Sequence, residues 1–274
     1  MIVFPKAKIN LGLRITGKRS DGYHDLETVF YSVGLCDALE YVVSPEKTDH
    51  DIITITGINI VGNQEDNLVI KTIKRIRKTY PIPYLKIHLH KVIPLGAGLG
   101  GGSSDAANLL RIINRCFNLS IPAGRLKSIA LELGSDCPFF IDGTPAYATG
   151  RGEILEPVGD VLSGYYLVLL NPGIGINTRE AYQSCHPQKP TISLNAIIKK
   201  PIAEWKNLMV NDFEEFAFSK HPVISTIKNE MYNSGALFSL MSGSGSSVYG
   251  VFQKKPEIPD KLKKFVIWEG LFQL

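Results

Sequence analysis

Residues 96–102 contain five glycines in seven positions, in the order Gly-Ala-Gly-Leu-Gly-Gly-Gly. The whole chain has 25 glycines among 274 residues, so an average stretch of this length would hold fewer than one. Because glycine has no Cβ, the backbone N–H groups of such a segment can turn toward a ligand without steric hindrance. A strand pattern precedes the segment and helical spacing follows it, and a helix N-terminus favours bound anions. The sequence therefore predicts a phosphate-binding loop between a strand and a helix.

Three interpretations of this loop compete. An ordinary helix cap at Ser103 or Ser104 needs one suitable residue and does not need five glycines. The dinucleotide-binding spacing G-x-G-x-x-G also matches, at Gly96, Gly98 and Gly101. However, a second helix pattern follows in place of the strand and acidic residue that this fold requires. A nucleoside triphosphate loop outside the Walker type fits best, since neither G-K-S nor G-K-T follows.

Composition places the chain among ordinary globular proteins. Hydrophobic residues make up 44% and charged residues 20%, with a mean hydropathy of +0.04. These values exclude disordered, collagen-like and membrane classes. The net charge is only +4 and the sequence has no basic stripe, so nucleic acid is not an expected partner. The longest apolar runs, such as residues 165–170, are too short to span a bilayer, so no membrane association is expected.

The order of the predicted elements and the cysteine pattern indicate the fold class and the compartment. Strand and helix patterns succeed one another irregularly, which favours an α+β fold. A hinge at residues 157–164 would separate an N-terminal nucleotide-binding domain, 1–157, from a C-terminal substrate-side domain, 158–274. The four scattered cysteines include no Cys-x-x-Cys pair, and the N-terminus lacks a signal-peptide pattern. We therefore expect a cytoplasmic protein with free, mostly buried thiols.

Hydrophobic periodicity predicts the individual elements. Apolar residues alternate over 7–15, which predicts a half-buried strand with Lys8 and Asn10 on its outward face. A glycine- and serine-rich hairpin and a terminal segment at 265–274 complete the chain. The other predicted elements are strands at 51–60, 85–93 and 165–170, and helices at 67–78, 106–117, 124–133, 192–218 and 223–233.

Four motifs together resemble those of the GHMP small-molecule kinases. Residues 94–107, P-L-G-A-G-L-G-G-G-S-S-D-A-A, are similar to the family's P-x-x-x-G-L-G-S/G-S-S motif, and residues 241–247, M-S-G-S-G-S-S, to its last motif. The segments A-K-I-N-L and T-G-K-R-S-D-G-Y-H, at 7–11 and 16–24, and G-S-D-C-P-F-F, at 134–140, resemble the branch that acts on a cytidine diphosphate-linked sugar alcohol. The motifs span residues 7 to about 252, most of the chain.

This resemblance implies an α+β, two-domain fold with the active site in the cleft between the domains. It also implies that the chain phosphorylates an alcohol group of that small-molecule substrate, using ATP and Mg²⁺. Two alternatives remain: a GHMP-type kinase for another alcohol, or a catalytically silent nucleotide-binding relative. The pair Lys8 and Asp136 argues against the silent relative, which has no need of both.

The resemblance assigns catalytic roles to Lys8 and Asp136. Judged alone, Lys8 would be an outward-facing strand lysine, and Asp136 a turn or helix-capping aspartate. The hydroxyl of Ser103 or Ser104 is the candidate for contact with Mg²⁺ or a phosphate oxygen. The residues expected to hold the nucleotide are Pro94, Leu95, Gly96, Ala97, Gly98, Leu99, Gly100, Gly101, Gly102, Ser103 and Ser104.

The same resemblance indicates how the substrate is bound. Tyr23 would stack on cytosine and His24 would hydrogen-bond the base, which suits recognition of a pyrimidine. The segment N-P-G-I-G-I-N-T at 171–178 resembles the family's H-P-G-x-x-I-x-T, with asparagine in place of histidine. Further expected substrate contacts are Asn10, Thr178 and a second stacking ring at Tyr182. The loop with Gly243 and Gly245 either closes over the sugar alcohol and its phosphates or is only a tight hairpin.

Overall fold

The computed structural model describes residues 1–45, 48–60 and 63–272, which form two compact units. Unit 1 comprises residues 1–7, 35–95 and 100–143, and unit 2 comprises residues 8–34, 96–99 and 144–274. The grouping differs from the predicted single boundary after residue 157. Two long N-terminal strands belong with the C-terminal half of the chain, and the expected hinge at 157–164 lies inside unit 2.

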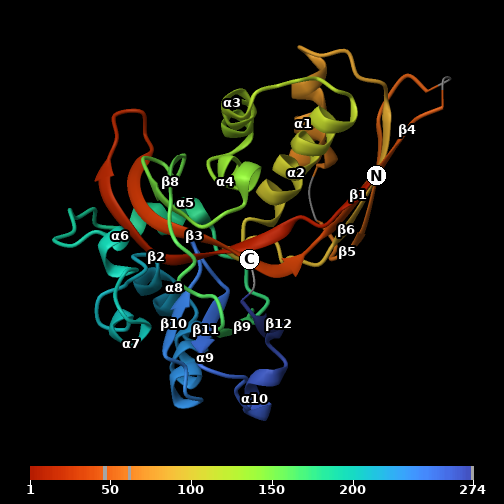
Figure 1. Ribbon diagram of the computed structural model, residues 1–274. Helices are drawn as coiled ribbons and strands as arrows, with labels where there is room; N and C mark the ends of the chain where they lie inside the picture. Colours follow the sequence, from red (N-terminus) through yellow and green to blue (C-terminus); the bar gives the residue numbers. More distant parts are fainter. Residues whose placement is uncertain (46–47, 61–62, 273–274) are drawn as a thin grey trace. The chain divides into compact units, whose positions relative to one another are not determined.

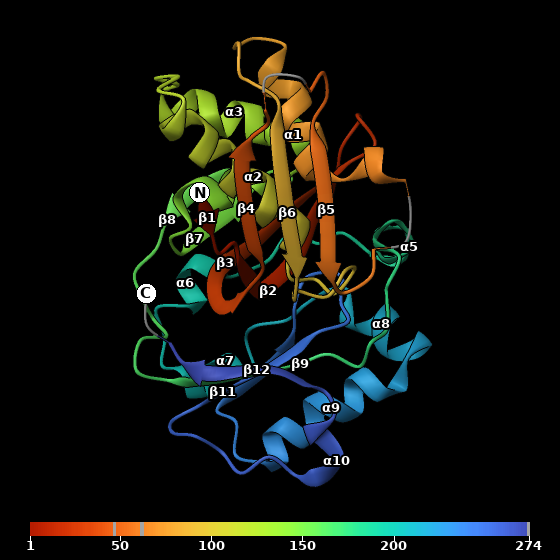
Figure 2. The ribbon, with the colours of Figure 1, turned by 90° about the vertical axis from the view of Figure 1, so that its right-hand side faces the viewer.

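Unit 1 contains a four-stranded sheet in the order β1-β4-β6-β5. Its strands are β1 (Ile2–Val3), β4 (Ala38–Val43), β5 (Ile52–Gly57) and β6 (Leu85–Lys91). Only the β5–β6 pair is parallel among these pairings. Buried and exposed residues alternate along β6, and Figure 1 shows α1 and α2 on one side of this sheet. In Figure 2 the uncovered face of β4, β6 and β5 is turned to the viewer. The strands predicted at 51–60 and 85–93 are thus confirmed.

Three helices of unit 1 lie close to their predicted positions, whereas η1 and α4 were not predicted. They are the 3₁₀ turn η1 (Gln64–Asp66), α1 (Leu68–Arg77), α2 (Gly101–Cys116), α3 (Ala123–Leu133) and α4 (Cys137–Asp142). The Asn67 side chain caps α1 by accepting a hydrogen bond from Val69 N–H at 2.8 Å. Helix α2 begins at Gly101, five residues before the predicted start, because the apolar spacing becomes visible only at Ala106. The last two glycines of the run are therefore helical.

Unit 2 holds two further four-stranded sheets. One has the order β2-β3-β7-β8, with β2 (Lys6–Lys18), β3 (His24–Cys36), β7 (Ala146–Thr149) and β8 (Ile154–Pro157). The other has the order β10-β11-β9-β12, with β9 (Tyr166–Leu170), β10 (Phe238–Met241), β11 (Val248–Phe252) and β12 (Val266–Leu271). The predicted strand at 165–170 and the hairpin are confirmed. Strand β12 lies within the predicted terminal segment, of which residues 273 and 274 fall outside the described residues.

Strand β2 is buried on both faces from Ala7 to Leu13, so the predicted half-buried strand is wrong on this point. The cause is long-range packing within unit 2. A Cβ on Gly12 would lie 2.6 Å from the side chain of Leu194 and 2.9 Å from that of Met209. The covering residues lie far along the chain, where periodicity within β2 carries no information about them.

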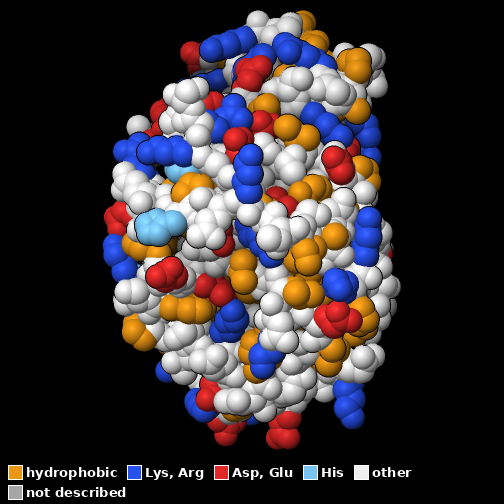
Figure 3. Space-filling model, turned by 90° about the vertical axis from the view of Figure 1, so that its left-hand side faces the viewer, with side chains coloured by type: hydrophobic (Ala, Val, Ile, Leu, Met, Phe, Trp, Pro, Cys, Tyr) orange, Lys and Arg blue, Asp and Glu red, His pale blue; other side chains and the backbone are white. Residues whose placement is uncertain are grey.

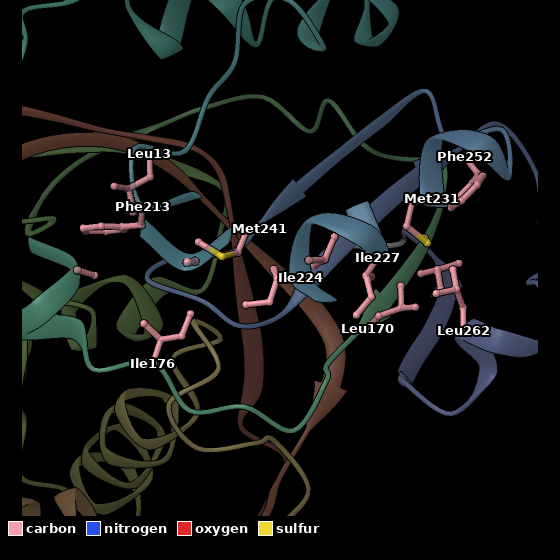
Figure 4. Packing of buried hydrophobic residues seen from close by; sticks show 14 of the residues in the cluster. Leu13, Leu170, Ile176, Phe213, Ile224, Ile227, Met231, Met241, Phe252 and Leu262 are labelled. Carbon is pink, nitrogen blue, oxygen red and sulfur yellow. The ribbon is translucent and has the colours of Figure 1, made fainter. Parts of the chain in front are cut away.

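The helices of unit 2 are short apart from α9. They are α5 (Thr178–Ser184), α6 (Leu194–Ile197), α7 (Ile202–Trp205), α8 (Glu214–Lys220), α9 (Pro222–Asn233) and α10 (Asp260–Lys263). The predicted helix at 192–218 is thus three pieces, and Pro201 and the irregular stretch at 206–213 separate them. Helix α9 is confirmed. Its Ile224, Ile227 and Met231 enter a core with Leu170 of β9 and Met241 of β10, as Figure 4 shows.

Charged side chains of both signs are mixed on the surface (Figure 3), whereas the cysteines are less buried than expected. Lys and Arg side chains are interspersed with Asp and Glu on the face drawn in Figure 3. Among residues 1–45, 48–60 and 63–272, no helix is both long and apolar enough to cross a bilayer. The four cysteines are free thiols, and only Cys137 is fully buried. His88 and His90 are exposed on β6, where both rings hydrogen-bond the Thr56 hydroxyl.

Candidate active site

The glycine loop adopts a backbone that few other residues could follow. Gly96, Gly98 and Gly100 have φ angles of +61°, +76° and +68°, in the left-handed region that favours glycine. At Gly98 the packing is also tight, because an added Cβ would lie 1.9 Å from the carbonyl oxygen of Ser242. Gly100 is the N-cap of α2 and provides no side-chain cap, so the first N–H groups of the helix are not satisfied by a capping side chain.

The two serines that follow the glycines have different roles in unit 1. Ser104 is fully buried, and its hydroxyl donates a 2.7 Å hydrogen bond to the carbonyl oxygen of Lys6. This bond commits the Ser104 hydroxyl to the fold. Ser103 is half-buried and lies within hydrogen-bonding reach of the Cys137 thiol. Of the two predicted candidates for a phosphate or Mg²⁺ contact, the structure therefore favours Ser103.

Asp136 lies in the same unit, in the turn that leads into α4. It is half-buried and occupies the N-cap position, with Pro138 in the first turn, but its carboxylate accepts no hydrogen bond from the N–H groups of that helix. A Cβ on Gly134 would lie 3.4 Å from the Cys137 sulfur and 3.8 Å from the Ser103 hydroxyl. The turn of Asp136 thus lies beside the first turn of α2. Burial raises the pKa of Cys137 to about 12, so this thiol stays protonated.

A buried charge cluster that the sequence analysis did not identify anchors both ends of the loop within unit 1. The Lys91 ammonium, at the end of β6, donates to carboxylates of Asp37 and of Asp105 in α2, the latter at 2.7 Å. Asp37 also accepts hydrogen bonds from the N–H groups of Val92 and Ile93, at 2.6 and 2.9 Å. The sequence did contain one indication of this cluster: Lys91 occupies a position that alternates in step with the buried residues of β6. Burial, and then the negative charge of Asp37, raise the pKa of Asp105 to about 7.

We expect Asp105→Asn to remove a pH dependence of stability. The folded chain retains a proton on Asp105 up to about pH 7, whereas the unfolded chain loses it near the ordinary aspartate pKa of 3.8. The free energy of unfolding therefore falls by up to about 1.4 kcal/mol per pH unit within this window as pH rises. The variant has no such group, so its stability relative to the wild type should rise between pH 5 and pH 8 by roughly 3 kcal/mol.

Urea unfolding of both proteins at pH 5, 6, 7 and 8 measures this difference. The control is Asp66→Asn, at an exposed aspartate paired with Lys71 on the surface, and its difference from the wild type should stay nearly constant. Parallel stability curves for Asp105→Asn and the wild type would contradict the assignment of the titration to Asp105.

In unit 2, the structure brings Lys8 and Asn10 together on β2. The Lys8 ammonium donates a 2.5 Å hydrogen bond to the Asn10 Oδ1 atom and lies 5.1 Å from the centre of the Phe30 ring. Asn10 in turn donates from its Nδ2 atom to the Thr28 hydroxyl at 2.9 Å. Lys8 is only 3% exposed, so the interpretation of it as an outward-facing strand lysine is wrong. A buried lysine needs such partners to offset the cost of desolvation.

The terminal glycine loop meets the first glycine loop and β2 within unit 2. Residues 242–247 connect β10 to β11 as a hairpin, in which Met241 pairs with Val248. The Ser242 hydroxyl donates to the Gly98 carbonyl oxygen at 2.9 Å and accepts from Asn10 N–H at 3.2 Å. Ser247 N–H donates to the Ala97 carbonyl oxygen at 3.1 Å. The hairpin interpretation is confirmed as a description of the backbone, and the hairpin lies directly against predicted site residues.

Several of the predicted substrate residues also lie together in unit 2. The His24 and Tyr182 rings stack with centroids 5.2 Å apart and planes 23° apart. The Thr178 hydroxyl lies 2.9 Å from that of Ser244, next to Gly243 and Gly245.

Two neighbouring residues carry contacts that the sequence analysis did not assign. Tyr23 is 53% exposed, and the guanidinium of Arg151 lies 4.3 Å from the centre of its ring. Asn171, which replaces the family's histidine, donates to the hydroxyls of Ser246 and Ser247 at 3.3 and 3.0 Å. Asn171 therefore supports the hairpin loop from within the fold. Arg151 could not be identified from the sequence, because a single arginine after a glycine is common on surfaces.

Two oxygen donors in unit 1 would suit an Mg²⁺ ion that is held mainly by the phosphates of a nucleotide. In the part of the chain that the structure describes, no group of three or more His, Cys, Asp or Glu side chains is arranged to hold a metal. In unit 1, the Ser103 hydroxyl and the Asp136 carboxylate are oxygen donors on neighbouring turns. Mg²⁺ typically takes one or two such ligands and completes its shell with phosphates and water.

A left-handed glycine loop that opens onto a helix, in an α+β chain with a buried lysine on a neighbouring strand, is typical of a nucleotide-dependent phosphotransferase. The comparisons with known proteins agree. Residues 67–144 match the family model for the GHMP kinase N-terminal domain, and residues 193–267 match that for the GHMP kinase C-terminal domain. The archaeal mevalonate kinase of Methanococcus jannaschii shares this fold, with a TM-score of 0.66 at 15% identity over 96% of this chain and 92% of that one.

Much more similar relatives carry a single name. Proteins named 4-diphosphocytidyl-2-C-methyl-D-erythritol kinase from Parabacteroides distasonis and Bacteroides thetaiotaomicron are each 49% identical to this chain. The first alignment covers 98% of this chain and 99% of the relative, and the second 95% of each. A crystal structure of a 4-(cytidine 5'-diphospho)-2C-methyl-D-erythritol kinase has a TM-score of 0.76 at 31% identity, over 92% of this chain and 90% of that one. The chain belongs to the GHMP kinases, and among them to the 4-diphosphocytidyl-2-C-methyl-D-erythritol kinase family.

Proposed function

We propose that this chain is an ATP-dependent kinase that phosphorylates 4-diphosphocytidyl-2-C-methyl-D-erythritol to its 2-phosphate, a step in the non-mevalonate isoprenoid precursor pathway. The observation that carries the proposal is 49% identity along almost the full length of both chains to a relative of that name. The motif D-G-Y-H at 21–24, which a galactokinase or mevalonate kinase is not expected to have, supports the cytidine-linked substrate in particular.

In the proposed reaction, the acceptor hydroxyl oxygen bonds to the γ-phosphorus of ATP. The bond from that phosphorus to the β,γ-bridging oxygen breaks, and ADP leaves. Asp136 accepts or orients the hydroxyl proton, and the Lys8 ammonium stabilises the negative charge of the transferring phosphoryl group. The absence of a capping bond from the Asp136 carboxylate to its own helix supports a role outside helix capping. The burial of Lys8 supports a role other than solubility.

We assign the nucleotide phosphates to the N–H groups of the glycine loop and of the first turn of α2. The left-handed conformation at Gly96, Gly98 and Gly100 supports this assignment, because it exposes backbone donors where a Cβ would interfere. Mg²⁺ bound to the phosphates would neutralise part of their charge. The Ser103 hydroxyl is the candidate protein ligand for that ion.

We assign the cytidine end of the substrate to the aromatic residues of unit 2. Tyr23 and Tyr182 would present stacking surfaces for the base, and His24 a polar edge. The stacked rings of His24 and Tyr182 support their membership of one subsite. Asn10, Thr178 and the loop with Gly243 and Gly245 would contact the sugar alcohol and the diphosphate.

A coupled ADP-release assay tests this function and separates the alternatives. Purified protein with Mg²⁺ and ATP is offered 4-diphosphocytidyl-2-C-methyl-D-erythritol, mevalonate, galactose and homoserine in parallel. We expect ADP release with the first alcohol alone, at a kcat in the usual range for enzymes of about 1–100 s⁻¹. Turnover of another alcohol instead would identify a different GHMP-type kinase. Nucleotide binding without turnover of any of them would indicate a catalytically silent relative.

A further inference from the structure

We infer that Asn211 is a positioning residue that holds the terminal glycine loop, residues 242–247, against β2. In this position the loop directs its backbone N–H groups toward the diphosphate of the substrate. Asn211 follows α7 in an irregular segment and is 3% exposed. This inference rests on the proposed function, because the substrate it concerns is the cytidine diphosphate-linked alcohol.

The first observation is the complete use of the Asn211 carboxamide. Its Nδ2 atom donates to the carbonyl oxygens of Met241 and Gly243, both at 2.8 Å. Its Oδ1 atom accepts from Phe213 N–H at 3.0 Å. These carbonyls belong to the Met241–Ser242 and Gly243–Ser244 peptide groups, so a single side chain fixes two peptide groups of the loop. A buried amide with every donor directed at the backbone of one loop specifies the conformation of that loop.

The second observation is that the backbone around Asn211 is attached to β2. Leu13 N–H donates to the Val210 carbonyl oxygen, and Asp212 N–H donates to the Leu13 carbonyl oxygen, both at 2.9 Å. The Asp212 carboxylate also accepts from Ile15 N–H at 2.7 Å. Asn211 therefore connects two parts of unit 2: the strand that carries the predicted residues Lys8 and Asn10, and the hairpin loop.

The third observation is what this arrangement leaves available in the loop. With the Met241 and Gly243 carbonyls held by Asn211, the N–H groups of Gly243 and Ser244 have no hydrogen-bond partner among the residues that the structure describes. Two successive backbone N–H groups of this kind attract anions. Gly243 also lies close to the rest of the site, since an added Cβ would be 3.0 Å from the Gly98 carbonyl oxygen and 3.3 Å from Asn10 Oδ1.

The test variant is Asn211→Asp, which keeps the shape of the side chain but replaces the two N–H donors with an acceptor oxygen facing two carbonyls. The matched control is Asn207→Asp, the same change at an exposed residue four positions earlier. For Asn211→Asp we expect the KM for the cytidine diphosphate-linked alcohol to rise about tenfold or more. A change of this size corresponds to the free energy of one or two buried hydrogen bonds. The KM for ATP should rise much less, within about twofold, because Asn211 hydrogen-bonds the terminal loop directly and reaches the predicted triphosphate loop only through it.

Amide hydrogen exchange, measured without any substrate, provides a second readout. Exchange at Gly245 and Ser247, whose N–H groups bond Ser242 and Ala97 carbonyls, should accelerate about tenfold in Asn211→Asp, while the β9–β11 ladder stays protected.

The inference is overturned if this exchange is unchanged, or if the two KM values stay the same or rise together. Asn211→Ala carries the same expectations should Asn211→Asp not fold, and failure of both to fold would make Asn211 a general determinant of the fold, contrary to the inference. If the wild type does not turn over this alcohol, the proposed function fails, whereas the exchange measurement still tests whether Asn211 holds the loop.

Discussion

Replacing Asp136 by asparagine should lower kcat by about 10²–10⁴-fold, the usual contribution of a positioned general acid–base group. Asparagine has the same shape but cannot accept the proton of the acceptor alcohol. The fold should tolerate the change, because the Asp136 carboxylate provides no cap for α4. The KM for ATP should change little, since the predicted nucleotide contacts are backbone N–H groups. Steady-state kinetics with both substrates varied, together with a thermal melt, measure all three quantities.

The control for this experiment is Asp142→Asn, at the other end of α4. Asp142 pairs with Lys127 at 2.5 Å on the surface, where such pairs contribute little. Its kcat should stay within about twofold of the wild type, since its partner and its position lie outside the proposed mechanism. If Asp136→Asn retains near-normal activity while folding normally, Asp136 has no part in proton transfer or in orienting the alcohol.

Replacing Gly98 by alanine should destabilise the protein by about 3 kcal/mol or more. A non-glycine residue at φ +76° is strained by about 1–2 kcal/mol, and the new Cβ would also meet the Ser242 carbonyl oxygen at 1.9 Å. That oxygen belongs to backbone held by Asn211 and by the hairpin, so it cannot move without breaking hydrogen bonds. The corresponding loss in Tm is about 6–12 °C for a chain of this size.

The comparison variant is Gly124→Ala, near the start of α3. An added Cβ there meets nothing within 4 Å, and alanine is the better helix former by about 0.5–1 kcal/mol, so Tm should hold or rise slightly. Urea unfolding and thermal melts of both variants decide the matter. Equal stability of Gly98→Ala and the wild type would mean that the two glycine loops do not approach as closely as the structure places them.

The sequence predicted the parts of the site that local chemistry requires. The glycine run predicted a loop between a strand and a helix, and residues 96, 98 and 100 adopt the left-handed backbone that such a loop needs, while its contact with phosphate stays a prediction. The joint position of Lys8 and Asn10 followed from the period of a strand, and their contact in the structure agrees. The α+β class and the family were also predicted and are confirmed.

What the sequence could not reveal depends on residues far apart in the chain. The burial of β2 on both faces comes from side chains near residues 194–211 and 242–249, which no periodicity within β2 reports. Asn211 falls inside the helix predicted at 192–218, and its role appears only from the bonds of its amide to the carbonyls of Met241 and Gly243. The Lys91 cluster joins three segments of unit 1, and only the burial of Lys91 could have been suspected from parity.

The route of the chain through the two units affects how the protein can be made and divided. Leu13 pairs with Asn211, and Asn10 with Ser242, so the second residue of each pair follows the first by about 200 positions or more. During synthesis, β2 cannot pack against these partners until most of the polypeptide has been made. Contacts between residues so far apart in the sequence also slow folding. A fragment ending at residue 157 would lack those partners and expose the apolar faces of β2. Any division of this enzyme into separately expressed halves therefore has to keep residues 8–34 with the C-terminal part, as a circular permutation of the chain would do.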